Sequence, residues 1–264
     1  MTQLVRYDVA DGVATLMLDN PERRNAWSRA MEDEYFDTLD RAAADDAVRA
    51  IVVTGAGRAF CPGLDTAQLA GRRPQHYALT VPKPMVAAVN GACAGVGLVQ
   101  ALVCDVRFVA RDARLSTAYA RRGLPAEYGT SWLLTRLVGV ERALDLLLSA
   151  RTFDGEEAHA LGLASRLCER DEVLGAAQAY AADLARWSSP RAMAAIRRQV
   201  WGDLGRDYPD ANARWLAVMK QFNTPANGDF AEGVASFVEK RPPVFAPLRN
   251  DWPLPPLPPF AAQE

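Results

Sequence analysis

The sequence predicts an α/β fold in which buried strands alternate with helices. Three observations support this. Short apolar runs rich in β-branched residues recur through the first ~120 residues, each run ends at a Gly or Asn breaker, and stretches with helical periodicity separate the runs. Beyond residue 130 the strand signal fades into leucine-rich helical stretches. A chain of 264 residues therefore fits one large α/β core with a smaller helical appendage.

The first half of the chain is expected to contain four strands and one well-defined helix. The strands are predicted at 13–18, 50–54, 84–89 and 106–110. The continuous apolar run at 50–54 is typical of a strand buried on both faces. Ser28 is the expected N-cap of a helix whose apolar stripe follows at Met31, Tyr35 and Leu39.

The second half is expected to be helical. Asp154 and Glu157 have the spacing of a capping box, and Gly162 is placed as the glycine that ends that helix. The predicted helices are at 131–138, 143–149, 155–161, 171–187, 190–201, 210–222 and 230–240. Eight of the 17 prolines fall in the last 23 residues, which predicts an extended or disordered tail. The core is assigned to residues 1–195 and the helical region with its tail to 196–264.

Composition and charge exclude several classes of function. The chain has 30 Lys+Arg against 32 Asp+Glu, so the basic footprint of a nucleic-acid-binding protein is absent. The uncharged run at 84–104 contains Asn90, Gln100 and three glycines, which favours a buried strand, turn and helix over a membrane span. No two cysteines have C-x-x-C spacing, which predicts no metal site and reduced, mostly buried thiols in a cytoplasmic protein. These cysteines are Cys61, Cys93, Cys104 and Cys168.

Common catalytic motifs are missing, and two glycine-bearing turns remain. The chain has only two histidines and no G-x-S-x-G, H-E-x-x-H, G-x-G-x-x-G or P-loop pattern. The turns at 58–65 and 89–97 each follow an apolar strand and are expected to open a helix. The first turns of helices present unpaired N–H groups. Two such turns facing each other would donate to one oxygen, an oxyanion hole suited to a thioester carbonyl that becomes an enolate. Each turn alone has the simpler interpretation of an ordinary structural turn.

The order of these motifs resembles the crotonase, or enoyl-CoA hydratase/isomerase, superfamily over about residues 5–245. The motifs that carry the resemblance are Asn20-Pro-Glu-Arg-Arg-Asn-Ala26, Ala59-Phe-Cys-Pro-Gly-Leu-Asp65, Pro82-Lys-Pro-x-x-Ala-Ala-Val-Asn-Gly91, Cys104-Asp105, Arg136-Leu-Val-Gly139 and Glu232-Gly-Val-x-x-Phe-x-Glu-Lys-Arg-Pro242. The resemblance implies a spiral of ββα units followed by a helical C-terminal trimerisation region, assembled as a homotrimer or a dimer of trimers.

The resemblance also implies an acyl-CoA site. The backbone N–H groups of Leu64 and Val96 would form the oxyanion hole. Val96 stands where many relatives have the middle glycine of three, so the turn must be unstrained there. Arg24 would lie near the CoA phosphates, and Lys240 would reach the phosphate of a neighbouring subunit. An ordinary solvated charge is the alternative for both cations. The CoA groove would be lined by Ala59, Leu64, Asp65, Thr66, Ala67 and Val96.

Departures from the family pattern bear on the reaction. The two glutamates that hydratases place around a water are Val99 and Tyr119 in this chain. Tyrosine titrates near ~10 and is a poor base at neutral pH. A third family position holds Glu127, and a lone carboxylate beside an oxyanion hole can move a proton between carbons. The alternative is that Glu127 caps the helix beginning near Thr130. Tyr119 is expected to orient Glu127 or the acyl group.

The expected activity is double-bond isomerisation of an enoyl-CoA thioester by Glu127, with coenzyme A entering as part of the substrate and no other cofactor. Two alternatives stay open at this point. One is hydration that uses Glu127 alone, and the other is a non-catalytic acyl-CoA binding protein. No membrane partner is expected, and the sequence does not specify the acyl group.

Overall fold

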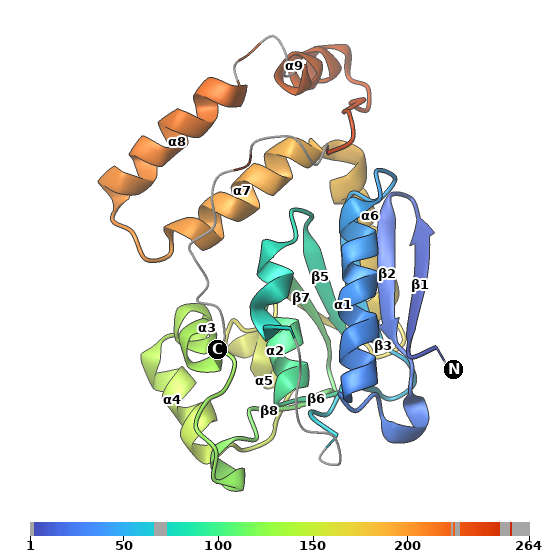
Figure 1. Cartoon of the computed structure of the whole chain (residues 1–264), viewed down its shortest axis with the longest axis vertical. Coiled ribbons are helices and arrows are strands. Elements are labelled where there is room, and N and C mark those ends of the chain that lie inside the picture. Colours follow the sequence, from blue (N-terminus) through green and yellow to red (C-terminus); the bar gives the residue numbers. More distant parts are fainter. Residues whose placement is uncertain (1–2, 66–72, 223, 225–227, 249–253, 255–264) are drawn as a thin grey trace.

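A six-stranded sheet forms the centre of the computed structural model, which describes residues 3–65, 73–222, 224, 228–248 and 254 (Figure 1). The strand order is β1-β2-β3-β5-β7-β10, with β1 antiparallel to β2 and all other neighbours parallel. The predicted α/β class and all four predicted strands are confirmed. The strands are β1 (Val5–Ala10), β2 (Val13–Leu18), β3 (Ala50–Gly55), β5 (Met85–Val89), β7 (Val106–Ala110) and β10 (Arg166–Cys168).

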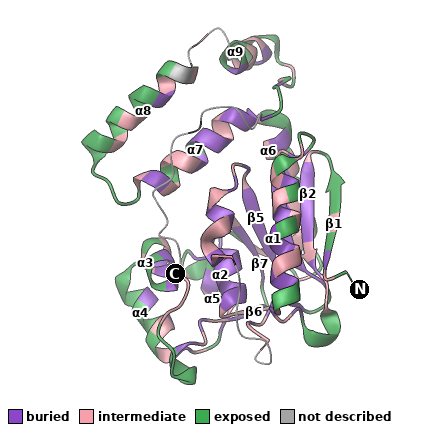
Figure 2. Ribbon diagram, viewed as in Figure 1, coloured by how far each residue is buried: buried purple, intermediate pink, exposed green. Residues whose placement is uncertain are grey.

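Helices cover both faces of this sheet. Alternate side chains of a strand point to opposite faces, so Ile51 and Val53 pack in one hydrophobic cluster and Val52 in another. The first cluster includes side chains of helices α1 (Arg29–Ala44) and α2 (Val96–Leu102), and the second includes side chains of α6 (Val173–Trp187). This two-sided cover explains why β3 and β5 are buried along their whole length (Figure 2).

A second, four-stranded sheet of very short strands lies at one end of the molecule, and the sequence did not predict it. Its order is β4-β6-β8-β9, in which β4, β6 and β8 are parallel. Three-residue strands inside glycine-containing motifs give no period-2 pattern to detect. Each parallel strand follows a longer strand of the main sheet, and α2 and α3 complete two ββα units. The strands are β4 (Ala59–Cys61), β6 (Ala92–Ala94), β8 (Arg114–Ser116) and β9 (Phe153–Asp154).

The remaining helices agree closely with the prediction. Asp154 caps α5 by accepting from the Glu157 amide, while the Glu157 carboxylate pairs with Arg151, so only half of the predicted capping box forms. Gly162 has φ +80 and ends this helix as expected. The α-helices are α3 (Thr130–Val138), α4 (Val140–Ser149), α5 (Gly155–Ala160), α7 (Pro190–Asp203), α8 (Tyr208–Phe222) and α9 (Asp229–Glu239). The 3-10 helices are η1 (Pro21–Arg23), η2 (Gln75–Thr80) and η3 (Ala120–Arg122).

The C-terminal helices α8 and α9 extend beyond the sheet core at one end of the long axis (Figure 1). Their surfaces are largely exposed or half-buried (Figure 2). The boundary placed at residue 195 falls inside α7, which connects the core to these helices. Most of the proline-rich tail lies outside the described residues.

Candidate functional site

The two glycine turns predicted to face each other are in contact. The first turn follows β4 and the second follows β6, and because these strands are parallel neighbours their carboxyl ends lie at the same edge. A Cβ placed on Gly95 would lie 3.8 Å from Gly63 Cα, and one placed on Gly63 would lie 3.3 Å from the Ala94 carbonyl oxygen. Both glycines have positive φ, +117 for Gly63 and +52 for Gly95. Glycine therefore gives both the sharp turns and the close approach.

The backbone of Leu64 is fixed by Trp27. The Trp27 amide donates to the Gly63 carbonyl at 2.9 Å, and the Asp65 amide donates to the Trp27 carbonyl at 3.0 Å. Leu64 and Trp27 thus form a parallel bridge in which the neighbours of Leu64 make both hydrogen bonds. Successive peptide groups of an extended chain point to opposite sides, so the N–H of Leu64 is directed away from Trp27.

Val96 supplies an N–H group at the start of α2. It is the first residue of that helix, and the first four amides of a helix have no intrahelical acceptor. The positive φ is on Gly95, and Val96 has a helical backbone, so the expectation of an unstrained valine is confirmed. The structure brings the two turns together, while the use of both amides on one substrate oxygen stays a prediction.

Glu127 lies half-buried in the turn before α3, and it does not cap that helix. The N-cap is Gly129, with no side-chain cap, so the capping interpretation of the Glu127 carboxylate is wrong. It is the backbone carbonyl of Glu127 that binds the helix, by accepting from the Thr130 hydroxyl at 2.7 Å and the Thr130 amide at 2.9 Å. The carboxylate is therefore not committed to the helix terminus.

Tyr119 is buried beside Glu127 and is neutral at physiological pH. Its phenol lies 3.0 Å from Thr130 Oγ1, so Thr130 connects Tyr119 to the Glu127 backbone. Burial raises the pKa of Tyr119 to about 12, and the Glu127 carboxylate acts in the same direction. Burial and then Glu127 likewise raise the pKa of Tyr128.

The other position that departs from the hydratase pattern is also buried. Val99 is fully buried in α2 and presents no titratable group. Tyr119 and Val99 therefore offer no carboxylate pair.

The residues predicted to bind CoA are only partly assembled within one chain. Ala59 is buried at the start of β4, and Asp65 lies 3.4 Å from Arg23 in an ion pair. Arg24 is exposed after η1. Lys240 is exposed at the end of α9, at the opposite end of the long axis from β6 (Figure 1). The predicted residues Thr66 and Ala67, and the helix expected after them, lie outside the described residues.

The sequence analysis missed Glu32, a buried carboxylate beside these turns. Its side chain is 2% exposed and accepts from the Trp27 indole at 2.9 Å and the Gln75 amide at 2.7 Å. The detectable signal was its position: Glu32 lies three and four residues before Tyr35 and Phe36, on the buried face of α1. A charge on an apolar helix face needs partners.

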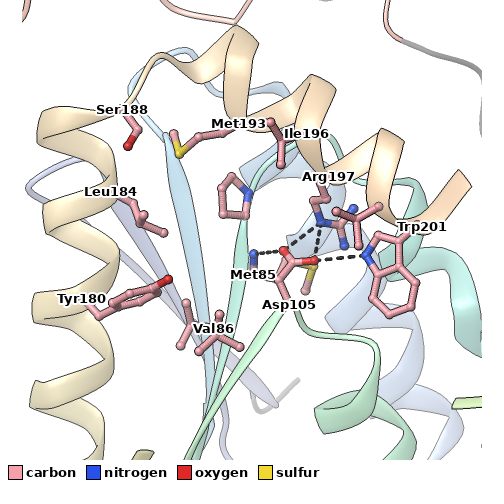
Figure 3. A pocket seen from close by; sticks show the side chains of 13 residues that line it. Met85, Val86, Asp105, Tyr180, Leu184, Ser188, Met193, Ile196, Arg197 and Trp201 are labelled. Atoms are coloured by element: carbon pink, nitrogen blue, oxygen red, sulfur yellow. Dashed lines mark hydrogen bonds and ion pairs between the residues drawn. The ribbon is translucent and has the colours of Figure 1, made fainter. Parts of the chain in front are cut away.

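An apolar cavity of about 380 Å³ lies elsewhere, between α6, α7 and the strands β5 and β7 (Figure 3). At its wall, Asp105 forms an ion pair with Arg197 at 2.8 Å and accepts from the Trp201 indole at 3.2 Å. The exposed side chains of Ile196 and Val200 border it. No residue predicted for the acyl-CoA site lines this cavity.

The described part of the chain contains no cluster of three His, Cys, Asp or Glu side chains arranged to hold a metal ion. Among the same residues, no helix has the length and apolar character needed to cross a membrane. Cys61, Cys93 and Cys104 are buried free thiols and Cys168 is half-buried, as predicted.

Comparison with known proteins gives consistent matches. Residues 8–247 match the family model described as enoyl-CoA hydratase/isomerase. A probable enoyl-CoA hydratase of Rhodobacter capsulatus is 37% identical over 91% of this chain and 97% of its own. The 1,2-epoxyphenylacetyl-CoA isomerase of Escherichia coli is 30% identical over 93% of this chain and 99% of its own. The crystal structure of a probable enoyl-CoA hydratase/isomerase from Mycobacterium abscessus superposes with a TM-score of 0.85 at 32% identity. The match covers 93% of this chain and 99% of that chain.

Proposed function

The chain belongs to the enoyl-CoA hydratase/isomerase family, and we propose that it isomerises the double bond of an enoyl-CoA thioester. The observation that carries the proposal is the half-buried Glu127, whose backbone is linked to Tyr119 through Thr130, at a site where Val99 and Tyr119 stand in place of the hydratase carboxylate pair. One acid–base group suits a proton transfer between two carbons. Concerted addition of water is better served by two.

The proposed reaction proceeds through an enolate. The Glu127 carboxylate removes a proton from C2 of a 3-enoyl-CoA, and the electron pair of that C–H bond forms a double bond between C1 and C2 as the π pair of the carbonyl moves onto the thioester oxygen. The N–H groups of Leu64 and Val96 stabilise the negative charge. Glu127 then returns the proton to C4 as the carbonyl reforms, which leaves the double bond between C2 and C3. The step involves no change of oxidation state, and coenzyme A takes part only as the carrier within the substrate.

Exchange of Glu127 for Gln tests the proposal. We expect Glu127→Gln to lower turnover of a 3-enoyl-CoA by roughly 10²- to 10⁴-fold, the usual contribution of a general acid–base. Binding of the ester should stay within about threefold, because the amide has the shape of the carboxyl group. Glu141→Gln is the matched control, since Glu141 is exposed on α4.

Two other outcomes would each replace the proposal. Hydration of crotonyl-CoA by the unmodified protein, without consumption of the 3-enoyl-CoA, would show a hydratase that uses Glu127 alone. Relatives named as hydratases favour that second candidate. Binding of acyl-CoA esters with no turnover of any would show a non-catalytic binding protein.

We also propose that the active species is a homotrimer or a dimer of trimers. The support is the set of apolar side chains exposed on α9, where Phe230, Phe237 and Val238 are at least 70% exposed. Apolar surface of this kind marks a contact with another protein chain.

A further inference from the structure

We propose that a buried polar chain formed by Trp27, Glu32, Gln75 and Gln100 positions the two oxyanion-hole amides relative to each other. Trp27 fixes Leu64, Gln100 belongs to the helix that begins at Val96, and Glu32 lies between them. The inference rests on the proposed function, because it concerns the same two amides. It assigns Glu32 and Gln100 as positioning residues.

The first arm of the chain holds Leu64. The backbone of Trp27 hydrogen bonds to both neighbours of Leu64, so a movement of Trp27 carries the Leu64 amide with it. The indole is 1% exposed, and its N–H donates to Glu32 Oε2 at 2.9 Å. Its ring packs edge-on against Tyr35 at 5.2 Å and Phe36 at 6.3 Å. Trp27 is thus fixed at its backbone, its ring and its polar atom.

The second arm reaches α2. Gln75, in η2, donates to the same Glu32 oxygen at 2.7 Å, and its own oxygen accepts from the Gln100 amide at 2.7 Å. Gln100 is fully buried and lies four residues after Val96, one turn along the same helix. A helix turn is stiff, so the hydrogen bond at Gln100 restrains the start of α2.

One oxygen of Glu32 fixes the direction of the hydrogen bonds in the chain, because it accepts from both the Trp27 indole and the Gln75 amide. Gln75 therefore turns its NH2 toward Glu32 and its oxygen toward Gln100. Gln100 must then give its NH2 to Gln75, and its own Oε1 is buried with no hydrogen-bond partner among the described residues. An apolar side chain at 100 would avoid this cost to folding. The buried oxygen is therefore better explained by a positioning role than by core packing.

Two substitutions, Glu32→Gln and Gln100→Leu, test the inference. Glu32→Gln keeps the shape but replaces the carboxylate by a neutral amide, which weakens both hydrogen bonds that the oxygen at 32 accepts from Trp27 and Gln75. Gln100→Leu removes the second arm together with the unpartnered oxygen, so it is expected to keep the protein folded. The matched control is Glu34→Gln on the same helix. The Glu34 carboxylate accepts from the amide of Leu4, just before β1, and from the amide of Val5, the first residue of β1.

The first readout is the split between kcat and KM on a 3-enoyl-CoA. We expect kcat to fall about 10- to 100-fold in both variants while KM changes less than about threefold. The reason is that displaced N–H donors lose more stabilisation of the charged enolate than of the neutral bound substrate. The second readout is the absorption spectrum of a bound conjugated aromatic enoyl-CoA. Its maximum moves to longer wavelength as amides polarise the carbonyl. This shift should shrink by at least half in both variants and not in Glu34→Gln.

The spectrum separates the two proposals. If the unmodified protein produces no shift, the oxyanion hole itself fails, and the proposed function fails with it. If the unmodified protein produces the shift and both variants match it in shift and kcat, only the positioning inference is overturned. Thermal unfolding shows whether each variant has kept its fold. If Glu32→Gln has lost its fold, the kcat and the spectral shift of Gln100→Leu alone decide whether the positioning inference holds.

Discussion

At the scale of single residues, the site combines backbone donors with a single titratable side chain. The donors are amides of Leu64 and Val96, whose apolar side chains have no part in the chemistry. The acid–base role is assigned to Glu127, whose backbone carbonyl is held by Thr130 while its carboxylate stays off the helix terminus. Tyr119 completes this arrangement through Thr130.

Tyr119→Phe tests whether the phenol acts only by orientation. The pKa of Tyr119 is about 12 because of burial, so its hydroxyl is protonated throughout the useful pH range. Loss of one neutral hydrogen bond is worth about 0.5–1.5 kcal/mol, so kcat should fall roughly 2- to 10-fold. The pH profile of kcat between 6 and 9 should keep its shape. A change in that shape would mean that the phenol moves a proton.

Lys83 gives the fold a dependence on pH. Burial lowers its pKa from 10.5 to about 8, against the opposing effect of Asp45 and Asp46. Between about pH 8 and 10.5 the unfolded chain keeps a proton that the folded chain has lost, so the free energy of unfolding rises with pH. Burial also raises the pKa of the Cys61 and Cys104 thiols from 9.0 to about 12 and raises that of Cys93, so these thiols oppose the trend as the pH approaches 9 and reverse it at higher pH.

Urea unfolding at steps from pH 6.5 to 8 measures this effect, because the cysteine thiols contribute little there. Stability should rise toward pH 8 with a slope below about 1.4 kcal/mol per pH unit, the value for one proton. Lys83→Met should remove the rise. A slope that is unchanged in the variant would assign the effect to another group.

At the scale of elements, the close packing of α2 against β4 sets the geometry of the site. A Cβ on Gly97 would lie 2.1 Å from the Cys61 carbonyl oxygen, which is backbone and unable to move aside. Glycine at 97 therefore allows the helix that begins at Val96 to approach the strand before Leu64. β4 pairs with β6, the strand that leads into α2, which joins the strand and the helix at this contact.

Gly97→Ala is expected to separate α2 from β4. The clash belongs to the severe class of core substitutions, so the free energy of unfolding should fall by about 3 kcal/mol or more, and activity should be lost. Gly175→Ala in α6 is the control, because no atom lies within 4 Å of its Cβ position. That change should stabilise the protein by up to ~1 kcal/mol. Equal unfolding midpoints for the two variants would contradict the packing argument.

At the scale of the whole molecule, apolar surface gathers on the helices that follow the core. Phe230, Phe237 and Val238 are exposed on α9, and Ile196 and Val200 are exposed on α7 beside the apolar cavity. Lys240 ends α9 far from the turns of its own chain (Figure 1). A contact between subunits would bury the apolar residues and give Lys240 a site on a neighbour.

Light scattering coupled to size-exclusion chromatography tests the assembly. The unmodified protein should have a mass of three or six times 28.8 kDa. Phe237→Asp places a charge at a side chain that is 85% exposed in the single chain, so it should shift the protein toward monomer without unfolding it. A monomeric unmodified protein would overturn the proposed assembly.

The sequence by itself determined the strands β2, β3, β5 and β7 and the helices. Their patterns are local: apolar runs, 3.6-residue stripes, the caps at Ser28 and Asp154, and glycine breakers. It also marked the two turns and Glu127 through their motifs. It missed β4, β6, β8, β9 and β10, because strands of two or three residues carry no periodicity and form only when neighbouring strands pair with them. It also missed the six-residue β1 at the edge of the main sheet, where most residues are exposed or half-buried.

Only the tertiary structure decided which distant groups meet. The contact between Gly63 and Gly95 and the links from Glu32 through Gln75 to Gln100 join residues that are 25 to 43 positions apart. Hydrogen bonds at such separations depend on the crossing of α1, η2 and α2, which no local pattern specifies. For the same reason Glu127 was open to interpretation as a helix cap until the backbone showed that its carbonyl, rather than its carboxylate, binds α3.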